Sequence, residues 1–172
     1  MYHKLSVYLK NKYSFATGVI VIVVLLDQIT KLYVHYNFDL GESIIIFEEY
    51  LDLTYIRNKG AAFGFLSDSN ETFRKTFFLA LTPLASIIIC RMIYKVKKNK
   101  KMKVLSLSLI LSGAIGNYIN RIHLGFVVDF LDMHFKEIYH WPAFNIADIA
   151  IVGGAFILVL TDRKKDPKVF QQ

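Results

Sequence analysis

Four long apolar runs alternate with polar segments along the chain. The first run, Tyr13–Leu26, would reach only about 21 Å as a helix, which is short of the roughly 30 Å hydrocarbon core of a bilayer. We therefore expect this helix to continue through Asp27 and Lys31. The other three runs are close to spanning length. The pattern predicts four membrane-spanning helices, at about residues 13–34, 73–94, 104–122 and 142–161.

The segment between the first two predicted spans, residues 36–72, has a different pattern. Ile44–Phe47 and Leu51–Ile56 are typical of two short strands, and Glu48–Tyr50 separates them. We expect these strands to form a small sheet on the membrane surface. The predicted fold class is therefore an all-α membrane protein with four transmembrane helices and a small β-sheet. Residues 1–172 are one domain's worth of chain and are expected to form a single domain.

Basic residues gather on one side of the predicted bundle. They precede the first span, join the second to the third and follow the fourth: Lys4, Lys10, Lys12; Arg91, Lys95, Lys97, Lys98, Lys100, Lys101, Lys103; Arg163, Lys164, Lys165 and Lys168. Short cytoplasmic loops retain Lys and Arg, so both termini are predicted to be cytoplasmic. The two remaining loops hold nearly all the acidic residues, and we expect them to face outward.

Composition narrows the classes of function. A hydrophobic content of 54% favours a bilayer as the solvent. The net charge of +7 does not indicate nucleic acid, because the basic residues are not interleaved with aromatics on a soluble face. The single cysteine, Cys90, excludes an internal disulfide and a thiolate metal cluster. No small-x-small cleavage site follows Leu26, so we expect the first helix to be retained as an anchor rather than removed as a signal.

Charged residues within predicted spans cost about 2.5 to 3.5 kcal/mol each at mid-helix and therefore need a reason. Asp27 and Lys31 are four residues apart on one helix face, where they can neutralise each other as an ion pair. Arg57–Gly64 follows the predicted strands and combines small residues with Asn58. Taken alone, this segment is as consistent with a tight turn as with a binding loop.

Two further clusters lie at the outer ends of the third and fourth spans. Gly113, Asn117 and Arg121 recur at four-residue spacing and share one stripe of a helix, which fits either close helix packing or a polar site. Asn145 and Asp148 are three apart and share a face. Asp148 is expected about two turns inside the last helix, without a basic partner at i±3 or i±4. It is either a functional carboxylate or a protonated acid bonded to a neighbouring helix.

Asp129 lies where the chain leaves the third span, and the connection from Phe130 to Pro142 could bring its carboxyl to that of Asp148. Two adjacent carboxyls hold one proton between them, and this is the working unit of an aspartic protease. One acid takes a proton from the attacking water while the other polarises the peptide carbonyl. Serine and metal hydrolysis are disfavoured, because His123, His134 and His140 accompany neither a Gly-x-Ser-x-Gly elbow nor HExxH spacing. We expect no metal and no cofactor.

Several of these motifs also carry a resemblance to a known family. In this order along the chain they resemble the motifs of the bacterial lipoprotein signal peptidases, or signal peptidase II: Asp27-Gln28-Ile29-Thr30-Lys31, Arg57–Gly64, Gly116–Arg121, Val127–Phe130 and Phe144–Asp148. The resemblance implies an intramembrane aspartic endopeptidase of the bacterial inner membrane, with its active site on the periplasmic side. Its substrates would be diacylglyceryl-modified prolipoproteins, cut just before the lipidated cysteine. Membrane lipids are expected contacts, and nucleic acid is not.

The resemblance also implies roles for individual residues. Asp129 and Asp148 would form the catalytic pair, whereas Asp27 and Lys31 would support the architecture. The substrate pocket would be lined by Asn58, Gly60, Asn117, Arg121 and Asn145. A short periplasmic helix is implied near residues 63–73. This chain departs from the family at Asn120, where relatives usually carry aspartate, which puts the orientation of Arg121 in question. The alternatives from other classes are a small proton- or ion-coupled transporter and a non-catalytic scaffold for lipidated partners.

Overall fold

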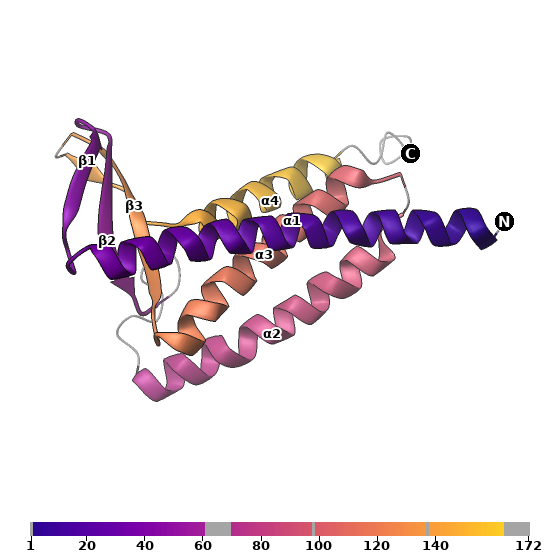
Figure 1. Ribbon diagram of the computed structural model, residues 1–172, viewed down its shortest axis with the longest axis horizontal. Helices are drawn as coiled ribbons and strands as arrows, with labels where there is room; N and C mark the ends of the chain where they lie inside the picture. The colour runs from indigo at the N-terminus through magenta and orange to yellow at the C-terminus, as the bar shows by residue number, and fades with distance from the viewer. Residues whose placement is uncertain (1, 61–69, 98, 137, 164–172) are drawn as a thin grey trace, which may run out of the picture.

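The computed structural model describes residues 2–60, 70–97, 99–136 and 138–163. Its elements follow one another as α1 (Tyr2–Asn37), β1 (Ser43–Phe47), β2 (Leu51–Asn58), α2 (Glu71–Lys95), α3 (Lys101–His123), β3 (Val127–Phe135), β4 (Tyr139–His140) and α4 (Ile146–Arg163). The four helices form an elongated bundle, and the strands lie together at one end of it (Figure 1). The start of α1 and the end of α4 lie at the other end.

Within the described residues, three helices are long and apolar enough to cross a membrane: Lys12–Asn37 within α1, Glu71–Lys95 and Lys101–His123. The helix α1 runs unbroken through Asp27 and Lys31, which confirms the prediction for the first apolar run. The helix α4 has only 18 residues, and three of them are charged: Asp148, Asp162 and Arg163. It is also shorter at its start than predicted.

The start of α4 corrects the sequence interpretation of Asp148. The predicted span began at residue 142, but the backbone of Phe144 is engaged in sheet-like pairing: its carbonyl accepts from Leu131 N at 2.9 Å, and its N–H donates to Leu131 O at 3.0 Å. A residue bonded in this way cannot continue a helix. The helix therefore starts at Ile146, and Asp148 lies in its first turn rather than two turns inside.

The helix α3 is the centre of the bundle, because it packs against α1, α2 and α4. Glycines allow the closest approach to α4. A methyl group added at Gly113 would collide with the carbonyl oxygen of Ala147, and one at Gly154 would come within 2.7 Å of the carbonyl oxygen of Ser106. The backbones of α3 and α4 are thus in direct contact at two levels, which fixes their relative height.

The strands form one antiparallel sheet in the order β1-β2-β3-β4. Its first two strands confirm the strands predicted within residues 36–72, whereas β3 and β4 were not predicted. A cluster of buried apolar side chains ties the sheet to the end of α1: Val34, Phe38, Tyr55, Val128 and Phe130. The sheet is therefore attached rigidly to the helices. The short helix expected near residues 63–73 falls mostly on residues 61–69, which lie outside the described part of the chain.

Candidate active site

The carboxylate of Asp129 is held on both oxygens by amides. In the register of the sheet, Asp129 is opposite Ile56, so its side chain lies on the same face as that of Asn58. Asn58 Nδ2 donates to Asp129 Oδ2 at 2.8 Å, and Asn145 Nδ2 donates to Asp129 Oδ1 at 2.6 Å. Only 2% of Asp129 is exposed. Strand pairing and two donors thus fix the position of this acid.

Asp148 is positioned by the start of α4. Asn145 Oδ1 accepts from the backbone N–H of Asp148 at 3.0 Å, and Asp148 Oδ2 accepts from the backbone N–H of Asn145 at 3.2 Å. This reciprocal pair is a capping box, which satisfies two backbone donors that a helix start otherwise leaves free. The other oxygen, Asp148 Oδ1, accepts from Asn117 Nδ2 at 2.8 Å. Asp148 is therefore anchored by the backbone at one oxygen and by α3 at the other.

Asn145 joins the two acids. Its amide nitrogen donates to Asp129, while its backbone N–H and its Oδ1 bind Asp148. The same amide nitrogen also lies 3.3 Å from Asn117 Oδ1, and Asn145 is fully buried. The structure thus brings together Asp129, Asp148, Asn58, Asn117 and Asn145, all of which were candidate site residues. These five side chains come from four elements: β2, α3, β3 and the start of α4.

The environment of Asp129 shifts its proton affinity. Burial raises the pKa of Asp129 to about 6, and the negative charge of Asp148 acts in the same direction. The amides of Asn58 and Asn145 oppose the rise, because they donate hydrogen bonds to the ionised form. With its pKa near 6, Asp129 can exchange a proton close to neutral pH. A general acid or base needs this property.

Asp27 and Lys31 contact the residues that hold Asp148 in place. Lys31 Nζ donates to Asp27 Oδ2 at 2.8 Å and to Asn117 Oδ1 at 2.7 Å. Since an ammonium group only donates, the oxygen of the Asn117 amide must face Lys31 and its nitrogen must face Asp148. Asp27 Oδ1 accepts from the backbone N–H of Ala147 at 2.9 Å, which places a negative charge at the start of α4. Both charges are completely buried and orient the donors around Asp148.

Gly60 and Arg121 bond to each other, and Arg121 is close enough to Asp129 and Asp148 to feel their charges. Arg121 donates to the carbonyl oxygen of Gly60 at 2.9 Å, and its guanidinium lies 4.5 Å from the ring centre of Phe78. Its Nε is buried without a hydrogen-bond partner among the described residues. Within that part of the chain, neither Gly60 nor Arg121 bonds to Asp129 or Asp148. They join the end of β2 to α3.

Sequence reasoning missed two residues that contribute to this network, Gln28 and Asn120. Asn120 is 3% exposed; its Oδ1 accepts from Val128 N at 3.1 Å, and its Nδ2 donates to Gln28 Oε1 at 3.2 Å. Gln28 Nε2 in turn donates to Asp27 Oδ2 at 2.9 Å. Asn120 thus secures the residue before Asp129 and does not orient Arg121. The sequence did offer one signal: Gln28 is a polar amide next to Asp27 in an apolar helix, and no partner had been assigned to it.

The histidines are separate from this cluster. His134 and His140 stack on each other with ring centroids 5.0 Å apart, beside Asp52 and Asp132 and five or more residues along the chain from Asp129. Across residues 2–60, 70–97, 99–136 and 138–163, no group of three or more His, Cys, Asp or Glu side chains is arranged to hold a metal ion. The carboxylate cluster thus places a buried acid, Asp129, and a half-buried acid, Asp148, on one shared partner, Asn145.

Known proteins are similar to this chain in both sequence and fold. The family model described as signal peptidase (SPase) II matches residues 19–162. The lipoprotein signal peptidase of Syntrophus aciditrophicus is 47% identical over 139 residues, which cover 81% of this chain and 86% of the relative. The one of Geobacter sulfurreducens is 39% identical over 163 residues, covering 92% of this chain and all of the relative.

A solved structure titled as a bacterial membrane enzyme aligns with a TM-score of 0.77 at 32% identity, covering 91% of this chain and 94% of that one. A second structure titled in the same way has the same TM-score and identity, and it covers 89% of this chain. The family match extends from α1 to α4 and includes every residue of the carboxylate cluster. The chain therefore belongs to the signal peptidase II family, a family of aspartic peptidases.

Proposed function

We propose that this chain removes signal peptides from diacylglyceryl-modified prolipoproteins, cutting just before the lipidated cysteine, with Asp129 and Asp148 as the catalytic pair. The observation that carries the proposal is the bridge formed by Asn145, which binds one acid through its side chain and the other through its backbone and Oδ1. The relatives are named lipoprotein signal peptidases, which supports this reaction. The family match gives no support to the transporter alternative.

The chemistry requires one proton shared by the pair. The ionised carboxyl takes a proton from water as the water attacks the peptide carbonyl carbon. The protonated carboxyl donates to the carbonyl oxygen and later supports departure of the amine. Burial raises the pKa of Asp129 to about 6 and the charge of Asp148 acts in the same direction, so a proton on one acid is favoured by the charge on the other.

The remaining candidates have supporting parts in this mechanism. Asn58, Asn117 and Asn145 hold the acids with their amide nitrogens and would line the substrate pocket around them. Gly60 and Arg121 would bind the backbone of the substrate next to the scissile bond. Arg121 is suited to this because its guanidinium has five donors, and only one protein acceptor is engaged among the described residues. Asp27 and Lys31 maintain the geometry from behind.

The proposed setting is the bacterial inner membrane, crossed four times. The helix α4 would be the fourth span: it packs along α3, and its outward positions are apolar, including Val152, Phe156 and Val159. Its charged residues lie near its two ends, where a headgroup region tolerates them. The basic segments would then be cytoplasmic and the sheet periplasmic. The acids at the sheet end would meet both water and a lipid-anchored substrate.

A cleavage assay tests the proposal. The purified protein is incubated with a lipidated prolipoprotein, and Asp129→Asn and Asp148→Asn are compared with wild type. Each substitution is expected to abolish cleavage while substrate binding is largely retained, since Asn keeps the shape and removes the titratable proton. Asp132→Asn, on the same strand as Asp129 but outside the cluster, is the matched control and should cleave normally. Full cleavage by either substituted acid would refute the catalytic pair.

A further inference from the structure

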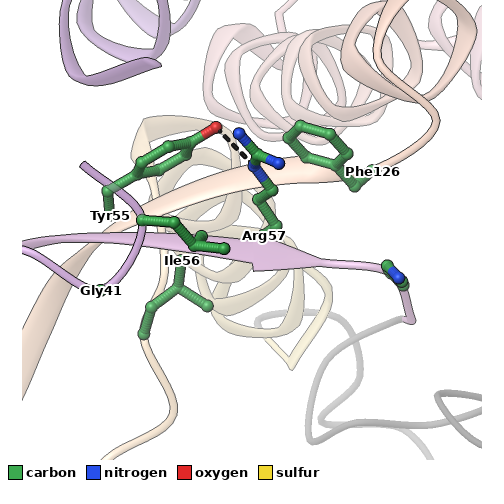
Figure 2. Close-up of a pocket in the computed structure, with 7 residues that line it drawn as sticks. Gly41, Tyr55, Ile56, Arg57 and Phe126 are labelled. Carbon is green, nitrogen blue, oxygen red and sulfur yellow. Dashed lines mark hydrogen bonds between the residues drawn. The ribbon is translucent and has the colours of Figure 1, made fainter. Parts of the chain in front are cut away.

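A pocket lies at the edge of β2, and its lining does not include the residues of the carboxylate cluster. It has a volume of about 550 Å³, and its lining includes Leu40, Tyr55, Ile56, Arg57, Lys59 and Phe126. The pocket exists because β1 pairs with β2 only as far as Thr54, and Gly41 N then closes on Tyr55 O at 2.9 Å. The last residues of β2 extend beyond this pairing. Figure 2 shows Tyr55, Arg57 and Phe126 gathered around this space.

Arg57 is held in place by neutral groups. Its Nε donates to the Tyr55 hydroxyl at 2.8 Å, and that hydroxyl bonds to His35 Nδ1. The guanidinium also lies 5.3 Å from the ring centre of Tyr55 and 5.0 Å from that of Phe126 (Figure 2). These contacts fix one edge of the guanidinium, and no acceptor among the described residues is bonded to its terminal N–H groups. A preoriented guanidinium loses little freedom on binding an oxyanion.

The positive charge of the pocket is not balanced by acidic side chains of the described residues. Ion pairs in this part of the chain involve Lys31, Lys75, Lys103 and two histidines, but neither Arg57 nor Lys59. Glu71 feels the charge of Lys59 but is itself bound by Lys75 at 2.7 Å. Two cations at one pocket therefore attract an external anion.

Neighbouring aromatic residues indicate the depth of the pocket. Tyr33 and Tyr36 are exposed on the last turns of α1, and exposed tyrosines mark the headgroup level of a bilayer. The pocket begins four residues later, at Leu40. Leu40 and Ile56 add an exposed apolar wall beside the two cations. The molecule facing this pocket thus carries a negative group and an apolar part, as a phospholipid does.

We propose that this pocket binds the phosphate group of an anionic phospholipid, with Arg57 as the forked donor and Lys59 as the second cation. The inference depends on the membrane setting but not on the peptidase chemistry. It also has a consequence for the cluster, because Asn58 lies between the two cations and donates to Asp129. A bound headgroup would hold the end of β2 that supports this acid.

Native mass spectrometry of the full chain released from detergent micelles tests the proposal. The protein is titrated separately with phosphatidylglycerol, with phosphatidylcholine, with diacylglycerol and with inorganic phosphate. Phosphatidylglycerol is expected to bind most tightly, since its phosphate charge is not cancelled by choline. Arg57→Gln and Lys59→Gln should each weaken that binding about fivefold, which corresponds to about 1 kcal/mol per cation at an anionic surface. The double variant should combine both losses.

Lys136→Gln is the matched control, because it removes the same charge from the far end of β3 and should leave lipid affinity unchanged. Arg57→Lys retains a charge without the fork and should bind better than Arg57→Gln. The thermal unfolding midpoint of each variant without lipid shows that it is folded. Equal affinity of wild type and the double variant for phosphatidylglycerol would overturn the proposal. So would equal affinity for phosphatidylcholine, or inorganic phosphate that binds as tightly as the lipid.

Discussion

Replacing Asn145 by serine separates its two contacts. In the wild type, Asn145 Nδ2 donates to Asp129 Oδ1 at 2.6 Å, and Oδ1 caps the backbone N–H of Asp148. Serine is as good a helix cap as asparagine, so its hydroxyl can keep the second contact. It has no amide to offer Asp129. The substitution therefore removes one donor from a buried carboxylate while α4 still starts at the same residue.

The size of the effect follows from that lost donor. A hydrogen bond to a charged group contributes about 1.5 to 3 kcal/mol, and 1.36 kcal/mol corresponds to one pH unit. Asn145 stabilises the ionised form, so its removal raises the pKa of Asp129 further above its ordinary range. We expect a water molecule to replace part of the stabilisation that the lost hydrogen bond gave to ionised Asp129. The acid limb of the cleavage rate should therefore move toward higher pH by about one unit, and the rate well above the limb should change little.

The assay is kcat/KM for a lipidated prolipoprotein as a function of pH, for wild type and Asn145→Ser. Asn70→Ser is the matched control, because Asn70 caps α2 through Thr72 N and Phe73 N and lies far along the chain from the acids. This control should leave the acid limb in place. If Asn145→Ser cleaves with an unmoved acid limb and a normal unfolding midpoint, the amide does not tune Asp129 and the reasoning is refuted.

Three further outcomes are expected. Gly116→Ala places a methyl group against the Asp27 carboxylate and should cost about 1 to 3 kcal/mol in thermal unfolding, whereas Gly153→Ala, with open space around it, should not destabilise. Lys31→Met leaves a buried carboxylate without its cation and should cost about 3 to 5 kcal/mol; Asp27→Asn in the same chain should recover part of this. The pKa of His134 is raised: burial opposes the charged form, but the Lys136 carbonyl and nearby acids outweigh it. Its contribution to stability should be full below the ordinary histidine pKa and lost as pH rises through the folded value; an NMR midpoint below the ordinary value would contradict this.

Local pattern was sufficient for some elements. Ile44–Phe47 and Leu51–Ile56 carry strand-forming residues around a short polar turn, and both strands are present. The continuation of α1 through Asp27 and Lys31 followed from the length that a membrane demands. The approach of Asp129 to Asp148 was expected from the connection between them, whereas the gathering of Asn58, Asn117 and Asn145 around them was implied only by the family resemblance. The roles assigned to those residues stay predictions until the cleavage assay is done.

Long-range pairing explains what local pattern could not supply. Val127–Phe135 begins with an apolar run that fits a helix end or a strand equally well, and it becomes β3 because β2 pairs along it. Residues 142–145 are apolar enough to extend α4, but Phe144 bonds to Leu131 and Asn145 caps the helix. The departure from the family at Asn120 raised a question about Arg121, whereas the structure bonds Asn120 to Val128 and Gln28. In each case the partner is distant in sequence.

The pairing of β2 with β3 also orders the assembly of the carboxylate cluster during synthesis. Asn58 and Asp129 are 71 residues apart, with α2 and α3 between them, and Asp148 is synthesised later still. A ribosome therefore delivers the supporting amide long before either acid. A chain interrupted before residue 148 would lack one acid of the proposed catalytic pair. On the proposed function, hydrolysis would begin only when α4 has joined the other elements.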